Sequence, residues 1–99
     1  MAKTTINVTE ELLLKLIPKL SKIYNLPAEI RKKYRIYVTE LPGYRYSSEV
    51  KRWWNPLGNG WYYRWQSRNT LLIAKDLGYK RGILQYSMDR RAIPAILSL

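Results

Sequence analysis

The sequence predicts an α+β fold in one domain, residues 1–99, in which N-terminal helices pack on an aromatic-rich antiparallel hairpin and a helical segment follows. Three patterns lead to this prediction. Apolar residues recur at helical spacing after residue 9, all four tryptophans fall within residues 52–65, and helical spacing returns after residue 69. Hydrophobic residues make up 46% of the chain, which is sufficient for one compact core.

The N-terminal segment, residues 3–41, is expected to begin with a short strand and continue into a helix. Residues 3–8 alternate in polarity, as a half-buried strand does. Thr9 then offers a hydroxyl cap, and the two glutamates that follow it lie where the helix dipole favours acids. Pro18 interrupts the apolar stripe, so a kink or break is expected just before it.

The end of this segment is compatible with two structures. Pro27 is expected to open a second helix, and apolar residues keep a helical stripe from Ile30 to Leu41. The run YRIYV, residues 34–38, is equally compatible with a strand because its residues are β-branched and aromatic. Pro42 and Gly43 end the segment in either case.

Residues 44–68 are predicted to form a β-hairpin, because Asn55-Pro56-Leu57-Gly58 has turn chemistry. A loop of residues 56–59 would place Lys51 opposite Arg64 on one face of the hairpin. Like charges in this position repel each other, and a bound anion would remove the repulsion. The expected open face carries Lys51, Trp53, Tyr62 and Arg64, and the expected packed face carries Trp54, Trp61 and Trp65.

The aromatic cluster has more than one interpretation. On the open face, Trp53 or Tyr62 could stack on a base or ribose beside the two cations. The cluster could instead be purely a structural core, or an aromatic-rich interface for a protein or a membrane surface.

Residues 69–99 are predicted to be helical, with Asn69 or Thr70 as the cap and Gly78 as a terminator. The sequence IAKDLGYKRGILQYSM, residues 73–88, resembles a helix-turn-helix motif. This resemblance implies that Tyr79, Lys80, Arg81 and Gln85 belong to the turn and the recognition helix. The alternative is a core helix that ends at Gly78 and is followed by a basic surface loop.

The charge balance favours a polyanionic partner. Lysine and arginine total 18 against 7 acidic residues, a formal net charge of +11. Such an excess repels itself in the folded state, and binding to nucleic acid relieves that repulsion. The apolar runs are far shorter than the roughly 20 residues of a membrane span, and the first ten residues lack the apolar core of a signal peptide. An intracellular protein is therefore expected.

The absence of cysteine and histidine limits the chemistry that the chain can perform. It excludes a thiolate nucleophile, a Ser–His pair and metal sites built from these residues. The seven acidic residues show no clustered spacing. Neither an enzyme nor a metal or organic cofactor is expected.

The segment KTTINVTEELLLKLIPKLSKIYNLPAEIRKKY resembles the ribbon-helix-helix family of DNA-binding repressors. The resemblance implies a homodimer whose two-chain ribbon enters the major groove. It also implies that Lys3, Thr5 and Asn7 read bases and that residues 27–31 approach phosphate.

In its length and composition the chain is similar to small basic proteins of filamentous and rod-shaped viruses that infect hyperthermophilic archaea. It is short, has no cysteine and is rich in Tyr, Ile, Lys and Arg. The similarity implies a thermostable viral protein in the host cytoplasm.

The expected function is non-catalytic nucleic-acid binding, with double-stranded DNA as the favoured ligand, through Lys/Arg phosphate contacts and a few aromatic contacts. The alternatives are a protein-interaction module, such as a viral factor that binds a host protein, and a structural virion component. The candidate contact residues are Lys3, Thr5, Asn7, Lys51, Arg52, Trp53, Tyr62, Arg64, Arg68, Lys80 and Arg81.

Overall fold

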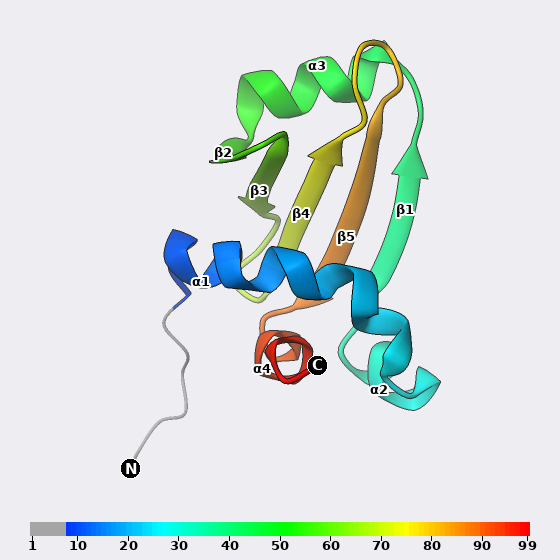
Figure 1. Cartoon of the computed structure of the whole chain (residues 1–99), viewed down its shortest axis with the longest axis vertical. Helices are drawn as coiled ribbons and strands as arrows, with labels where there is room; N and C mark the ends of the chain where they lie inside the picture. The colour runs from blue at the N-terminus through cyan, green and yellow to red at the C-terminus, as the bar shows by residue number, and fades with distance from the viewer. Residues whose placement is uncertain (1–7) are drawn as a thin grey trace.

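The computed structural model describes residues 8–99. The predictions for Lys3, Thr5 and Asn7 lie outside these residues, as does most of the strand expected at residues 3–8. The described chain combines helices with one five-stranded antiparallel sheet, in the strand order β1-β5-β4-β3-β2 (Figure 1). The α+β prediction is therefore confirmed.

The first helical segment forms largely as its sequence predicts. The α-helix α1 spans Glu10–Leu16, and the Thr9 hydroxyl accepts a hydrogen bond from the Leu12 N–H at 3.2 Å. Around Pro18 the backbone changes to the 3₁₀ helix η1, Ile17–Asn25, which confirms the expected break. The side chains that this segment buries are Leu13, Leu16, Leu20 and Ile23.

The second helix is short and a strand follows it. Helix α2 spans Ala28–Lys33, directly after Pro27, and strand β1 spans Tyr37–Leu41. Of YRIYV only Tyr37 and Val38 belong to the strand, and residues 34 and 35 form a turn, so the second helix of a ribbon-helix-helix unit does not continue to Leu41.

Residues 44–53 are helical, so the predicted hairpin of residues 44–68 is wrong in its first half. Helix α3 spans Tyr44–Trp53. Its Ser47 and Val50 are buried, and Trp54 follows on the same side with 8% of its surface exposed. This spacing of three and four residues is helical. The clustered aromatics indicated a strand, but burial of one helical stripe against the sheet determines the structure.

The hairpin that does form is shorter than predicted and has a different register. Strand β2, Asn55–Gly58, pairs with β3, Trp61–Trp65, and Asn55 lies opposite Tyr63. The predicted turn residues therefore belong to a strand. The Lys51–Arg64 cross-strand pair does not exist, because Lys51 lies on α3.

The C-terminal region is mostly β-structure, which corrects the helix predicted from residue 69 and the helix-turn-helix resemblance. Strands β4, Thr70–Asp76, and β5, Ile83–Asp89, form a hairpin, and only α4, Ala92–Leu97, is helical. The four consecutive residues from Leu71 to Ala74 are all buried. A continuous apolar run suits a central strand that is covered on both faces, and over so few residues its periodicity cannot distinguish strand from helix.

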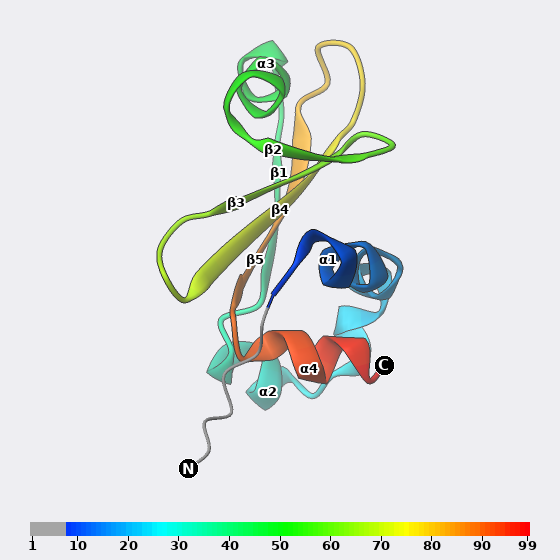
Figure 2. The ribbon, with the colours of Figure 1, turned by 90° about the vertical axis from the view of Figure 1, so that its left-hand side faces the viewer.

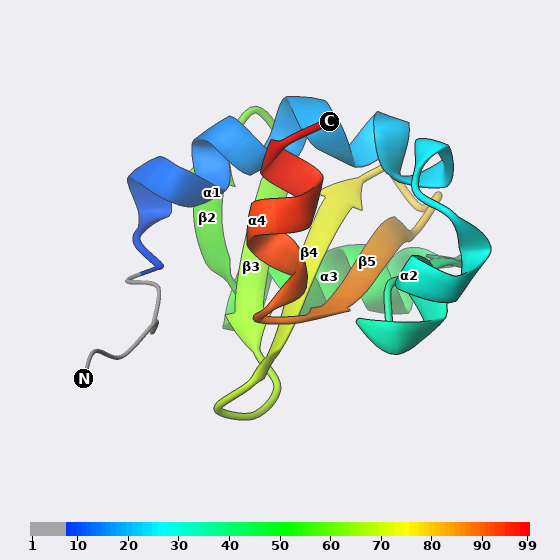
Figure 3. The same ribbon diagram turned by 90° about the horizontal axis from the view of Figure 1, so that it is seen from below.

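Helices cover both faces of the sheet, but at different ends. The helices α1, η1 and α4 lie on one face (Figures 2 and 3), where Leu71, Ile73 and Met88 join their core. Helix α3 lies against the other face, at the opposite end of the molecule from α2 (Figure 1). This second core consists of Val50, Trp54, Leu72, Ala74 and Ile83.

Candidate functional site

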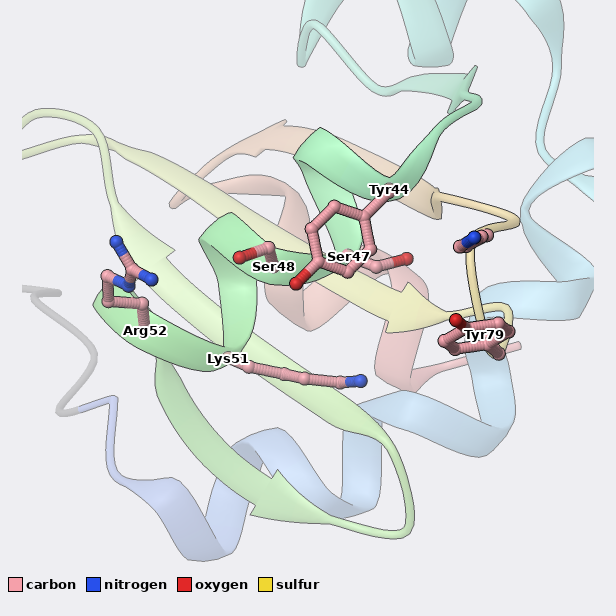
Figure 4. A pocket seen from close by; sticks show the side chains of 7 residues that line it. Tyr44, Ser47, Ser48, Lys51, Arg52 and Tyr79 are labelled. Atoms are coloured by element: carbon pink, nitrogen blue, oxygen red, sulfur yellow. The ribbon is translucent and has the colours of Figure 1, made fainter.

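One face of α3 forms the wall of a surface pocket with a volume of about 340 Å³. The helix residues that line it lie at relative positions 0, 3, 4, 7 and 8 along the chain, which is the spacing of a single helix face. The opposite wall is the loop between β4 and β5, residues 77–82, called here the β4–β5 loop. The lining residues, which define the α3 pocket (Figure 4), are Tyr44, Ser47, Ser48, Lys51, Arg52, Tyr79 and Lys80.

A buried pair of hydrogen bonds joins the two walls of the α3 pocket. The Ser47 hydroxyl donates to the Gly82 carbonyl oxygen at 3.0 Å and accepts from the Gly82 N–H at 3.0 Å. Gly82 has φ +98°, and a Cβ atom there would lie 2.1 Å from the Leu41 carbonyl oxygen. Since no side chain fits at this position, the backbone of the loop can approach residues 41–43, which lead into α3, only with glycine.

Asp76, the acidic residue next to the α3 pocket, already has an ion-pair partner and a hydrogen-bond donor. Lys51 Nζ lies 3.3 Å from Asp76 Oδ2, and Asp76 Oδ1 accepts a hydrogen bond from the Gly78 N–H at 3.3 Å. These contacts tie α3 and the start of the loop to the end of β4. Arg52 and Lys80 have no carboxylate within ion-pair distance among residues 8–99, so the pocket keeps an excess of positive charge.

The most exposed aromatic side chains around α3 border this pocket and a smaller neighbour of about 220 Å³. Tyr79 is 78% exposed, Trp53 69% and Tyr44 59%. The smaller pocket shares Tyr44, Ser48 and Arg52 with the first and adds Arg45, Glu49 and Trp53. Basic and aromatic side chains thus alternate over one end of the molecule, with Glu49 as the single acid that lines either pocket within the described chain.

The structure brings some of the predicted contact residues together and separates others. Lys51, Arg52 and Lys80 line the α3 pocket, and Trp53 lines its neighbour. Arg81 is exposed in the same β4–β5 loop.

The remaining predicted residues lie elsewhere. Tyr62 packs against the second core, so it is not on an open face. Arg64 is exposed on β3 and lines neither pocket. Arg68 belongs to the β3–β4 connection, at the end of β4 opposite the β4–β5 loop.

Sequence reasoning missed six residues that line the two pockets, namely Tyr44, Arg45, Ser47, Ser48, Glu49 and Tyr79. A signal for three of them was present, because the helix-face spacing that places Lys51 and Arg52 on the pocket also places Tyr44 and Ser48 there, with Arg45 adjacent. Tyr79 was assigned to a helix-turn-helix turn, and its position opposite α3 depends on a strand pairing that the sequence did not reveal.

Within residues 8–99, no three acidic side chains gather closely enough to hold a metal ion. None of the helices in the described range is both long enough and apolar enough to cross a bilayer. Hydroxyl groups, cations and aromatic rings are the functional groups that the α3 pocket presents, and these bind anions and flat rings.

Comparison of the chain with protein-family models, curated proteins and solved structures found no match. Function is therefore inferred from the geometry and charge of the site.

Proposed function

We propose that the protein binds nucleic acid without catalysing a reaction, that double-stranded DNA is its favoured ligand, and that α3 with the β4–β5 loop is the contact surface. One observation carries this proposal: Arg45, Arg52 and Lys80 surround two pockets at one end of the molecule, together with three highly exposed aromatic rings. Long cationic side chains reach phosphates, and aromatic rings contact sugars and bases.

The position of α3 suits a duplex. A ten-residue helix is about 15 Å long, and the major groove, roughly 12 Å wide, admits a helix. Helix α3 lies at one end of the elongated molecule, where a duplex can approach it (Figure 1). In this proposal the protein acts inside the cell.

Exposed Trp and Tyr side chains beside Arg are also typical of protein interfaces, which keeps a protein-interaction module as the second candidate. The two candidates differ in their electrostatics. Phosphate contacts release counterions, so nucleic-acid binding must weaken steeply with salt, and a protein interface of this composition need not.

A pair of charge-matched double variants tests where nucleic acid binds. Replacing Arg52 and Lys80 with alanine removes two cations at α3, and replacing Lys32 and Lys33 removes two from α2 at the other end of the molecule. Fluorescence anisotropy with a random-sequence duplex measures the affinity. We expect the Arg52→Ala/Lys80→Ala variant to bind about tenfold more weakly, since each exposed contact contributes under about 1 kcal/mol. The α2 variant should bind almost normally. Equal losses in both variants would contradict the assignment of the surface.

A further inference from the structure

We infer that the α3 pocket holds one unpaired nucleotide, whose base lies between Tyr44 and Tyr79 and whose phosphate contacts Arg52 and Lys80. This inference rests on the proposed function and specifies its ligand further. Nucleic acids with a single-stranded overhang or another unpaired nucleotide should therefore bind more tightly than fully paired ones.

The two tyrosine rings line the pocket from different elements. Tyr44 comes from the first turn of α3 and Tyr79 from the β4–β5 loop, and Figure 4 shows them on different walls of the hollow. Both rings are more than half exposed, so they have surface available for stacking. The volume of about 340 Å³ lies within the roughly 300–1,000 Å³ of small-ligand sites.

The charged groups lie next to these rings. Lys80 Nζ lies over the Tyr79 ring, 5.1 Å from its centroid, so a cation stands over one face of this ring. Arg52 and the Ser48 hydroxyl line the same cavity and can donate hydrogen bonds to phosphate oxygens. Lys51 is held by Asp76, and its side chain extends along the pocket in Figure 4. A negatively charged group with a flat ring attached matches this lining.

The walls keep their spacing without a ligand. The two Ser47–Gly82 hydrogen bonds join α3 to the β4–β5 loop, and Gly82 packs closely against residues 41–43. A preformed site loses less conformational entropy on binding, which favours affinity.

Within a nucleic acid, an unpaired nucleotide is the part that can use such a pocket. A base within a duplex is covered by its neighbours, and it must leave the stack before a protein can contact both of its faces. The pocket therefore adds affinity at overhangs, gaps and single strands, and the cations on the outside of α3 contact paired regions.

Three labelled DNA probes and three variants test the inference. The first probe is a blunt duplex, and the second is the same duplex with a short single-stranded overhang. In the third probe the nucleotides of the overhang are abasic, so the overhang keeps every phosphate but has no bases. We expect the overhang probe to bind about tenfold more tightly than the abasic probe, the effect of one stacked base. Tyr79→Ala should abolish this difference and Tyr79→Phe should retain it. Tyr24→Ala, which removes a similarly exposed tyrosine from η1, should also retain it.

The results distinguish an error in the pocket assignment from an error in the proposed function. Equal binding of the overhang and abasic probes, with salt-sensitive binding of the duplex preserved, would overturn the pocket assignment alone. A difference that survives Tyr79→Ala would overturn it as well. Absence of binding to all three probes would overturn both proposals.

Discussion

At the scale of single residues, the neighbours Trp53 and Trp54 have opposite environments. Trp53 is 69% exposed beside the smaller pocket, and Trp54 is 8% exposed in the second core. The sequence predicted both environments from strand alternation, although Trp53 ends a helix. The prediction succeeded because consecutive residues point in different directions in a helix as well as in a strand.

Substitution of these two tryptophans should therefore have unequal effects on stability. Trp54→Ala is expected to lower the free energy of unfolding by about 3–5 kcal/mol because it leaves a cavity in the core. Trp53→Ala should change it by less than about 0.5 kcal/mol. Trp54→Phe should cost less than Trp54→Ala because it leaves a smaller cavity, and it removes no hydrogen bond, since Trp54 Nε1 is buried without a hydrogen-bond partner among residues 8–99. Denaturant unfolding measures all three. A larger loss for Trp53→Ala than for Trp54→Ala would contradict the placement of α3.

Tyr63 links stability to alkaline pH. Its hydroxyl donates a hydrogen bond to Glu10 Oε2 at 2.7 Å, and this bond, with burial and the charge of Glu10, raises the pKa of Tyr63 to about 12. A raised pKa means that the stabilisation is complete below the unfolded-state pKa near 10 and is lost as the pH rises towards about 12. Because the bond lies at the surface, the contribution should be under about 1 kcal/mol.

The variant Tyr63→Phe measures this contribution. The stability difference between the wild-type protein and Tyr63→Phe should be constant from pH 7 to about 9.5 and should shrink above pH 10. Thermal unfolding followed by circular dichroism gives this difference. A difference that grows above pH 10 would contradict the pKa direction.

At the scale of elements, a single buried serine makes both direct hydrogen bonds between α3 and the β4–β5 loop within the described residues. Ser47 makes both hydrogen bonds to Gly82, and the neighbouring Ser48 lies on the pocket side. The two serines therefore provide an internal comparison.

We expect Ser47→Ala to lower the free energy of unfolding by about 1–3 kcal/mol, because it leaves the buried N–H and carbonyl of Gly82 without these partners. Ser48→Ala should change stability by less than about 0.5 kcal/mol. Denaturant unfolding of the two variants checks the expectation, and equal effects would show that the serine does not join the elements as described.

Local patterns in the sequence predicted some elements and not others. The cap at Thr9 and the break around Pro18 were predictable because they depend on nearby residues. Strand β4 was not predictable, because a short apolar run is compatible with a strand or with a buried helix. The packing on both of its faces determines which one forms. Helix α3 was missed because its aromatic neighbours suggested a strand, although the spacing of its buried residues is helical.

At the scale of the whole molecule, the sequence predicted the fold class and the charge, but not the pocket. The +11 charge and the aromatic cluster are properties of composition and order. The α3 pocket joins residues 44–52 to residues 79–80, which are far apart in the chain. Their meeting depends on the pairing of β4 with β5 and on the packing of α3 against this hairpin.

The salt dependence of duplex binding tests the central claim, that this surface binds nucleic acid through phosphate contacts. If Arg45, Arg52, Lys80 and Arg81 each contact one phosphate, the slope of log affinity against log salt should be about −3.6. Affinity for a random-sequence duplex should then be micromolar or tighter at ~50 mM salt and about a hundredfold weaker at ~200 mM. No binding at ~50 mM, or an affinity that does not change with salt, would contradict the account.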